Sequence, residues 1–403
     1  MTALRRQYFL SYAAIGSVMP LVTVFLREQG GFNYLQIGLA MSLMGIPSLC
    51  SPALITLLAD RKLDTRRILA VAYTCSAMVL GALFFSKSVA LTLMLFFFHG
   101  LASMAMLPLQ DGYYFSLSEE RRRAGMQVVE YPMVRIWGTT GYMFPGLLLY
   151  FPLLHGAEVR SILPCAILFC SLSFANSFTL SAVTRREASA TAKLPSRQAF
   201  AALFAPNARW LCLGLFFAYL AAATYYTFIG NYLDEIVRIP KPFIAPVILL
   251  GVLVEIGCTL LMPWLQATFR LKGIMVIGLF CMVMRMILLS FFPNPVVAVL
   301  VQLGHGFEVL ALYVGPIMFL NRLAGDEFRN SIQGVFAMSI TGSARVLGCL
   351  ASGLTAAHFG IQVNLLLGAV LGSVAFVIIT FFFSRIPPRE ESPEIAVSTT
   401  GHP

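Results

Sequence analysis

The sequence predicts an all-α membrane protein in which twelve transmembrane helices form two pseudo-symmetric six-helix bundles. Three observations lead to this fold class. The 403-residue chain is 58% hydrophobic and 11% charged, with a mean hydropathy of +0.81, whereas a soluble domain carries about a quarter charged residues. Twelve apolar stretches are long enough to cross a bilayer, which takes roughly 20 apolar residues. A polar segment separates the first six from the last six.

The expected spans follow one another through short connections. In the first half they cover 7–26, 34–59, 67–86, 89–118, 128–152 and 160–184. In the second half they cover 208–233, 242–268, 273–292, 295–320, 331–357 and 361–384. The longer ones are expected to tilt or to extend past the membrane.

The polar segment 185–207 is basic and rich in Ala and Ser. We interpret it as a cytoplasmic linker between an N-terminal bundle, 1–184, and a C-terminal bundle, 208–385. The tail 386–403 is polar and rich in Pro, so we expect it to be disordered.

The distribution of Lys and Arg predicts the orientation. If both termini are cytoplasmic, inside segments hold twenty Lys and Arg residues and outside segments hold five. Cytoplasmic loops carry the excess of basic residues in membrane proteins. We therefore expect both termini to face the cytoplasm.

The two halves also repeat each other. Residues 134–138 read VRIWG and residues 344–348 read ARVLG, and both stretches lie in the fifth span of their half. Span starts repeat at similar offsets, from 7 to 208 and from 128 to 331. Many transporters use a six-span unit twice and bind their solute near the midplane between the halves.

Charged side chains within the spans are the strongest functional signal. A charge at the bilayer centre costs roughly 2.5 kcal/mol or more, so each needs a partner, a water-filled cavity or a role. The candidates are Asp111, Arg135, Glu255, Arg285, His305, Glu308 and Arg345.

His305 and Glu308 lie three residues apart at the centre of the span 295–320. On a helix this spacing places both side chains on one face. Apolar surroundings favour the protonated carboxyl group, a nearby arginine favours the ionised one, and histidine titrates near neutral pH. The group of Glu255, Arg285, His305 and Glu308 is therefore predicted to couple proton binding to conformational change.

Structural roles are the alternative for several candidates. Buried Arg–Glu pairs can simply join helices, Asp111 could anchor the cytoplasmic end of span four, and Arg345 could act as a clamp. Tyr142, Tyr225 and Tyr226 could stack on or hydrogen-bond a ring-shaped solute. Helix packing or interface anchoring is the simpler explanation for any one of these tyrosines.

Several stretches resemble the major facilitator superfamily. The segment 58–67, LADRKLDTRR, is similar to that superfamily's signature between its second and third helices. The resemblance implies a gating role for Asp60, Arg61, Arg66 and Arg67. A finer resemblance is to the proton-symporter branch that holds lactose permease, nucleoside–proton symporters and the phenylpropionic acid transporter. The stretches that carry it are 16–43, PLQDG (108–112), VRIWGTTGY (134–142), VLVEIG (252–257), MRMILLS (284–290) and LGHGFEVLAL (303–312).

The resemblance also implies roles for single residues. Lactose permease carries a glutamate, an arginine and a His-x-x-Glu pair on helices eight to ten, and the matching positions here are Glu255, Arg285, His305 and Glu308. The match implies that Glu308, with Arg285, couples protons, and that His305 and Glu255 link the solute to that coupling. Arg135 matches a substrate-binding arginine.

Other positions also match in place, most of them with a different residue type. Asp111 matches an acidic position of phenylpropionate-type members. Tyr142 stands where the permease stacks a tryptophan on its sugar, and Gln302 replaces a lysine. Arg345 falls where the permease has a lysine, but the aspartates of helix seven have no counterpart near 223–226. A galactoside is therefore not implied, and Arg135 could receive a sugar hydroxyl, a nucleoside or a carboxylate.

We expect a secondary transporter that takes up a small organic solute, such as a sugar, a nucleoside or an aromatic carboxylate, together with a proton by alternating access. We expect it to act as a monomer in the bacterial inner membrane, without cofactor or nucleic acid. The alternatives are a solute sensor without turnover and a proton-driven exporter of the same fold. Mixed charges without a filter-like repeat disfavour a channel. The sequence has no nucleophile–base set, metal cluster or phosphate loop of the kind that indicates an enzyme or a nucleotide-driven pump.

Overall fold

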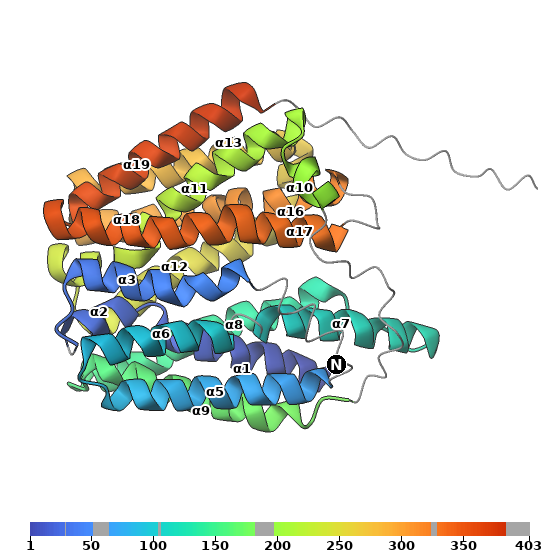
Figure 1. Cartoon of the computed structure of the whole chain (residues 1–403), viewed down its shortest axis with the longest axis horizontal. Helices are drawn as coiled ribbons and strands as arrows, with labels where there is room; N and C mark the ends of the chain where they lie inside the picture. The colour runs from blue at the N-terminus through green and yellow to red at the C-terminus, as the bar shows by residue number, and fades with distance from the viewer. Residues whose placement is uncertain (29, 51–63, 104–105, 182–196, 324–328, 384–403) are drawn as a thin grey trace, which may run out of the picture.

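The computed structural model describes residues 1–28, 30–50, 64–103, 106–181, 197–323 and 329–383. Within these ranges every regular element is helical, and the helices run roughly along one axis (Figure 1). Ten helices are long and apolar enough to cross a membrane, and the stretch Tyr34–Leu49 is a shorter apolar helix. The 24-residue helix α8 occupies the remaining expected position, so the described residues contain a helix at each of the twelve expected spans.

The described residues of each half follow the expected order. The first half consists of α1 (Thr2–Val18), α2 (Val22–Glu28), α3 (Tyr34–Gly45), η1 (Ile46–Leu49), α5 (Thr65–Phe85), α6 (Val89–Ser103), α7 (Met106–Arg123), α8 (Tyr131–Leu154), η2 (Val159–Ser161) and α9 (Ile162–Ser177). The second consists of α10 (Arg197–Leu203), α11 (Pro206–Asn231), η3 (Tyr232–Ile236), α12 (Lys241–Leu260), α13 (Met262–Phe291), α14 (Pro295–Leu300), η4 (Val301–Gly304), α15 (His305–Val309), η5 (Leu310–Val314), α16 (Gly315–Leu323), α17 (Arg329–Phe336), η6 (Ala337–Gly342), α18 (Ser343–Phe359), α19 (Ile361–Val377) and η7 (Ile378–Phe382).

Local chemistry sets several helix boundaries. Asn33 caps α3 in a capping box with Gln36, and Asp64 caps α5 through the Arg66 backbone N–H. Gly360 has φ +84°, a conformation that glycine adopts without strain, and it separates α18 from α19.

Some expected boundaries differ from the structure. The eighth and ninth crossings are divided by Arg270, whose φ of 55° and ψ of 169° break α13, so that 262–269 prolongs the eighth crossing. The fourth crossing continues to Arg123, past its apolar stretch, and Gly125 at φ +67° follows shortly after this end. The expected linker contains a short helix, α10.

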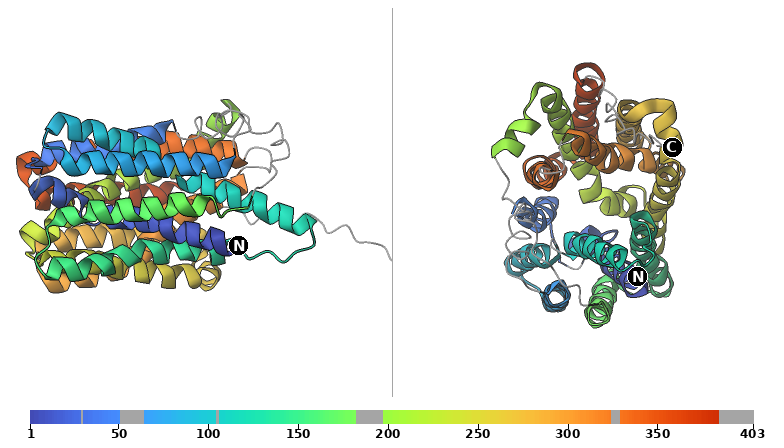
Figure 2. Two further views of the ribbon diagram at one scale, coloured as in Figure 1. Left: turned by 90° about the horizontal axis from the view of Figure 1, so that it is seen from below. Right: turned by 90° about the vertical axis from the view of Figure 1, so that its right-hand side faces the viewer.

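Corresponding helices make corresponding contacts in the two halves. In the first half α1 packs on α8 and α9, α5 on α9, and α3 on α6. In the second half α11 packs on α18 and α19, α13 on α19, and α12 on α15. Between the halves, α3 packs on α18 and α8 packs on α12, which are again equivalent pairs. The end-on view in Figure 2 shows the two groups of helices side by side.

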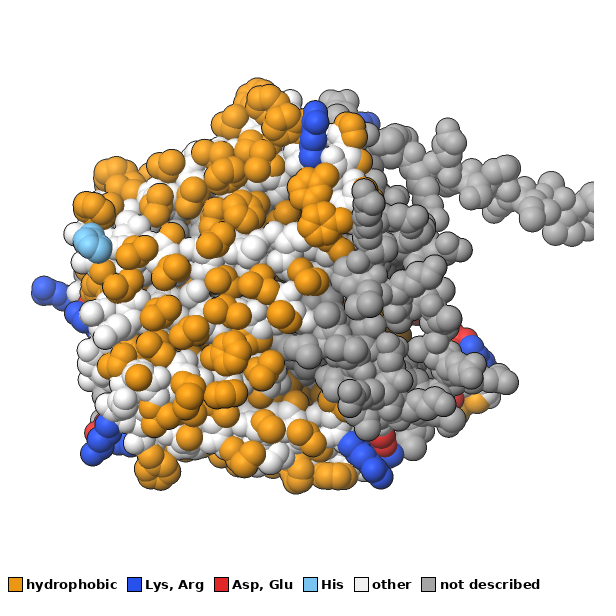
Figure 3. Space-filling model, in the orientation of Figure 1, with side chains coloured by type: hydrophobic (Ala, Val, Ile, Leu, Met, Phe, Trp, Pro, Cys, Tyr) orange, Lys and Arg blue, Asp and Glu red, His pale blue; other side chains and the backbone are white. Residues whose placement is uncertain are grey.

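The surface is divided as a bilayer requires. Apolar side chains cover the middle of the face in Figure 3, and the charged side chains drawn there gather toward the two ends. Large exposed side chains such as Phe151, Leu253 and Val370 are therefore explained by contact with lipid. The N-terminus and the end of η7 lie at the same end of the molecule, as an even number of crossings requires (Figure 1).

At the opposite end, glycines bring the two halves into backbone contact. A Cβ added at Gly38 on α3 would lie 2.5 Å from the Gly353 Cα on α18. A Cβ added at Gly230 on α11 would lie 2.9 Å from the carbonyl oxygen of Pro20. Such close approach is available only to glycine, so the two halves are packed without a gap at these crossings.

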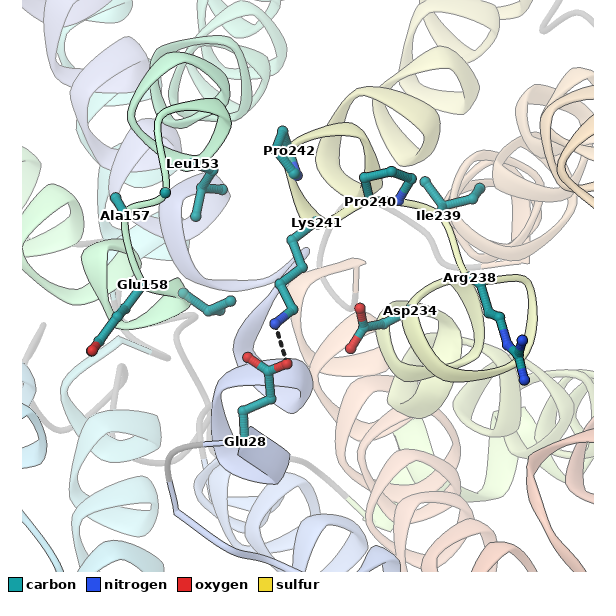
Figure 4. A pocket seen from close by; sticks show the side chains of 12 residues that line it. Glu28, Leu153, Ala157, Glu158, Asp234, Arg238, Ile239, Pro240, Lys241 and Pro242 are labelled. Atoms are coloured by element: carbon teal, nitrogen blue, oxygen red, sulfur yellow. Dashed lines mark ion pairs between the residues drawn. The ribbon is translucent and has the colours of Figure 1, made fainter.

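Ion pairs also connect the halves at this closed end. Glu28 pairs with Lys241, and Arg27 Nε lies 3.7 Å from a carboxylate oxygen of Glu235. The Tyr34 hydroxyl donates to Glu235 at 2.5 Å. Beside these pairs is an open pocket of about 690 Å³ (Figure 4), which is lined by residues 28, 153 and 156–159 of the first half and 234 and 238–242 of the second.

The glycine crossing predicts an unusual response to alanine. Alanine favours a helix over glycine by about 1 kcal/mol, but Gly38→Ala would force backbone apart, and overpacking costs about 1–3 kcal/mol. We expect Gly38→Ala to lower the melting temperature of the detergent-purified protein. Gly81→Ala is the matched control, because nothing lies within 4 Å of an added Cβ there, and it should leave the melting temperature unchanged or higher. Equal behaviour of the two variants would contradict the close crossing.

Candidate functional site

A buried ion pair forms the centre of the candidate site. Arg285 on α13 donates through Nη1 to the Oε2 atom of Glu308 on α15. Their relative exposures are 2% and 1%, so both charges are held away from water. Removing two charges from water is costly, and the cost is offset only when each charge retains good partners.

Gln302 and Tyr225 also contact the Arg285 guanidinium. Its Nη2 atom donates to Gln302 Oε1 at 3.3 Å, and its guanidinium lies 4.4 Å from the centre of the Tyr225 ring. Gln302 in turn donates to the carbonyl of Ala298 at 3.1 Å. Gln302 stands where lactose permease has a lysine. It therefore supplies an acceptor to Arg285 and adds no second positive charge.

Tyr226 covers the remaining oxygen of the carboxylate. Its hydroxyl donates to Glu308 Oε1 at 2.8 Å and lies 3.4 Å from His305 Nδ1. Both side chains on α15 therefore meet the same tyrosine, consistent with the common helix face that their spacing predicts. In contrast to Tyr225, which is 3% exposed, Tyr226 is 37% exposed.

His305 connects this pair to a second carboxylate. Arg285 Nη1 lies 3.3 Å from His305 Nδ1, and because arginine can only donate, Nδ1 is the acceptor. A neutral His305 then carries its proton on Nε2, which faces Glu255 on α12 at 3.8 Å. Glu255 also interacts electrostatically with Arg135, Tyr12 and Tyr142 of the first half, so it lies at the junction of the two halves.

The backbone of the tenth crossing is irregular at this point. The five-residue helix α15 follows the 3₁₀ turn η4 and precedes the π turn η5, and such irregularities are frequent at functional sites. Glycines allow neighbouring helices to approach. An added Cβ at Gly251 would lie 3.0 Å from the His305 side chain, and one at Gly306 would lie 2.8 Å from the Val254 carbonyl oxygen.

The first half contributes a separate polar cluster. One Asp111 oxygen accepts hydrogen bonds from Tyr8 at 2.5 Å and from Tyr131 at 2.9 Å. The Arg135 guanidinium lies 4.5 Å from the centre of the Tyr12 ring. Among the described residues Arg135 has neither an ion pair nor a hydrogen bond, so its N–H donors are available to a bound molecule.

Several polar side chains of the two clusters are accessible. Tyr226 and Tyr313 are 37% and 49% exposed. Arg135, Tyr142 and Glu255 are partly exposed. The unclaimed donors of Arg135 and the carboxylate of Glu255 therefore belong to accessible side chains, one on each side of the junction between the halves.

The other predicted residues are distributed differently. Arg345 is exposed on α18, with its aliphatic carbons near Gly45 of α3, and it forms no ion pair among the described residues. Arg66 pairs with Asp64, and this guanidinium holds the pKa of Asp64 below its ordinary range. Arg67 is exposed, whereas Asp60 and Arg61 lie outside the described residues.

Sequence reasoning missed the tyrosines that complete the first cluster. Tyr8, Tyr12 and Tyr131 are ordinary aromatic residues in a chain with 14 tyrosines. Tyr8 and Tyr12 share a helix face by their i, i+4 spacing, but the sequence gives no sign that this face meets Asp111 and Arg135. Tyr313 was missed for the same reason.

Comparisons with known proteins agree with this architecture. The model of the "MFS_1 like family" matches residues 1–367. Xanthosine permease of Escherichia coli (strain K12) is 26% identical over 376 residues, which are 88% of this chain and 87% of that protein. Nucleoside permease NupG of the same organism is 25% identical over 361 residues, covering 86% and 85% of the two chains. The crystal structure of nucleoside transporter NupG has a TM-score of 0.81 at 20% identity, covering 96% of this chain and 99% of the other, and shows the fold.

The central ion pair predicts a marked effect of removing one partner. Arg285→Met would leave Glu308 buried without its counter-charge, which typically costs about 3–5 kcal/mol. Arg123→Met is the matched control, because its pair with Glu119 is exposed, and such pairs contribute about 0–1 kcal/mol. Unfolding in mixed micelles should rank the variants in that order, and Arg285→Met with Glu308→Leu should recover most of the loss. A loss no larger in Arg285→Met than in the control would contradict a dry, paired site.

Proposed function

Since the chain belongs to the MFS_1 like family and is a membrane transporter, we propose that it carries nucleosides into the cell together with protons, by alternating access. The moving bodies are residues 1–184 and 208–385, with 185–207 as the linker between them. In this proposal the solute binds in a cavity between Arg135 and Glu255, and Glu308 carries the proton.

The observation that carries the proton part of the proposal is the buried pair of Arg285 and Glu308. A carboxylate that is almost inaccessible and balanced by one arginine changes the local charge whenever it binds a proton. Protonation leaves Arg285 without its counter-charge, so the surrounding helices then favour another arrangement. A transporter can use this difference to tie proton binding to its change of state.

The solute part of the proposal is supported by the relatives and by the accessible side chains of Arg135 and Glu255. Proteins named xanthosine permease and nucleoside permease match this chain over most of its length. A nucleoside offers hydroxyl and carbonyl oxygens to the free N–H groups of Arg135 and a flat base to the rings of Tyr12 and Tyr142. The carboxylate of Glu255 can accept from a ribose hydroxyl on the opposite side.

The close contacts between the halves support a proposal about which conformational state of the transport cycle the structure represents. The end closed by the Gly38 and Gly230 crossings is the end that the Lys and Arg distribution predicts to face outward. We therefore propose that the structure is a state closed toward the outside, as a transporter that releases solute and proton toward the cytoplasm must be. The proposal includes cytoplasmic termini, as the Lys and Arg distribution predicts, and a bacterial inner membrane.

The first test is solute-driven proton movement. Purified protein is placed in vesicles with an internal pH dye, and uridine, adenosine and xanthosine are compared with lactose and phenylpropionate. We expect nucleosides to acidify the lumen and Glu308→Gln to abolish the acidification while nucleoside exchange persists. Glu119→Gln, at an exposed surface carboxylate, is the control. Acidification by sugars or aromatic acids alone would refute nucleoside specificity, and its survival in Glu308→Gln would remove the proton role from Glu308.

Arg135 provides a separate test of the solute site. Arg135→Ala removes the donors that face the cavity, and hydrogen bonds to a charged group contribute about 1.5–3 kcal/mol, so nucleoside affinity should fall about 10-fold or more. Arg135→Lys keeps the charge but loses the planar guanidinium group. Its nucleoside affinity should lie between those of the wild type and Arg135→Ala. The nucleoside affinities of both variants are measured by titration in micelles. An unchanged affinity in Arg135→Ala would exclude this arginine from the solute site.

A further inference from the structure

We propose that the Tyr226 hydroxyl links solute binding to protonation of Glu308, because its single proton can be donated either to Glu308 or to the solute. This inference rests on the proposed function and assigns Tyr226 as a positioning residue for the proton site and as a direct contact of the solute. It explains how a nucleoside in the cavity changes the protonation of Glu308 without touching that carboxylate.

The first step is the position of Tyr226 between cavity and carboxylate. Glu308 is 1% exposed, whereas Tyr226 is 37% exposed. Its hydroxyl donates to Glu308 Oε1 at 2.8 Å, and Arg285 takes Oε2. A solute in the cavity therefore reaches the tyrosine and not the carboxylate.

The second step is the number of protons available. A tyrosine hydroxyl has one proton to donate. While Glu308 is ionised, that proton is engaged at 2.8 Å, and Arg285 and His305 offer no substitute donor to Oε1 among the described contacts. Once Glu308 is protonated, its own O–H can donate, and the Tyr226 hydroxyl is released to donate to an acceptor in the cavity.

The third step is linkage. If protonation of Glu308 frees a donor for the solute, then bound solute favours the protonated carboxyl to the same extent, because coupling between two binding sites is reciprocal. Solute and proton then bind together, as symport requires. The solute atom that meets Tyr226 must be an acceptor, which in a nucleoside is a ribose oxygen or a base carbonyl oxygen.

Other titratable groups near Glu308 are arranged differently. Those that face it are Arg285 and Cys281 on α13, Tyr226 on α11, His305 on α15 and Tyr313 on η5. Tyr225 on α11 lies against Arg285, and Glu255 on α12 lies on the other side of His305. The Tyr225 hydroxyl accepts a hydrogen bond from Gln302 Nε2 at 3.3 Å, and Tyr225 is buried. Among the hydrogen bonds of the described residues, Tyr226 and Arg285 are the donors to the Glu308 oxygens.

The test is the pH dependence of nucleoside affinity. Uridine binding to the purified protein in micelles is measured at acidic, neutral and alkaline pH. In the wild type we expect affinity to be about tenfold higher at acidic pH, a typical strength for coupling between two sites. In Tyr226→Phe the ring remains but the donor is lost, so affinity should stay near the wild-type alkaline value, within about twofold across the range.

Two further variants separate this role from a structural one. Tyr219→Phe removes a hydroxyl from the same helix that donates to the Leu312 carbonyl and does not contact the Glu308 oxygens, and it should retain the pH dependence. Glu308→Gln should bind uridine independently of pH, and adding Tyr226→Phe to it should weaken binding about tenfold at every pH. Melting temperatures of all variants show whether each is folded.

The outcomes are distinct from those of the transport assay. A Tyr226→Phe protein that is folded and keeps the wild-type pH dependence overturns the linkage through Tyr226. If the wild type binds no nucleoside and moves no protons, the proposed function fails in its own assay. If nucleoside drives proton movement in the wild type but Tyr226→Phe does so with unchanged affinity at every pH, the proposed function stands and this inference fails.

Discussion

The charge of Arg285 is the constraint on which the second half of the structure is organised. A guanidinium in the middle of an apolar bundle must be surrounded by acceptors, and Glu308, Gln302 and the face of Tyr225 supply them from three directions. Helices α11, α13 and the tenth crossing are positioned by these contacts. The irregular backbone around α15 and the glycines at 251 and 306 then let the helices approach closely enough for the contacts to form.

The first half uses a different arrangement. Its arginine stacks on Tyr12 and keeps its donors free, while the neighbouring carboxylate Asp111 is occupied by two tyrosine hydroxyls. One half therefore holds a paired arginine, and the other holds an arginine that has no ion pair or hydrogen bond among the described residues. In the proposed mechanism the first arginine serves the proton and the second serves the solute.

The sequence was sufficient for the architecture and for part of the site. Apolar length and the repeat across 134–138 and 344–348 predicted the two bundles, because a bilayer leaves few other ways to satisfy the backbone. Intramembrane charges could be found one by one, since each is expensive. Their mutual geometry could not be predicted, because the contacts of Tyr226 with Glu308 and of Tyr8 with Asp111 depend on helix rotation and crossing, and local spacing does not determine these.

The open pocket beside Glu28 and Lys241 has a consequence for pharmacology. Its walls come from both halves, so its shape exists while the outer end is shut and is lost when the halves separate there. A compound that filled it would bind one state and not the other, and it would shift the population toward that state by its difference in affinity. Such a molecule would bind away from Arg135 and Glu255, the proposed solute site, and would therefore act as a non-competitive inhibitor.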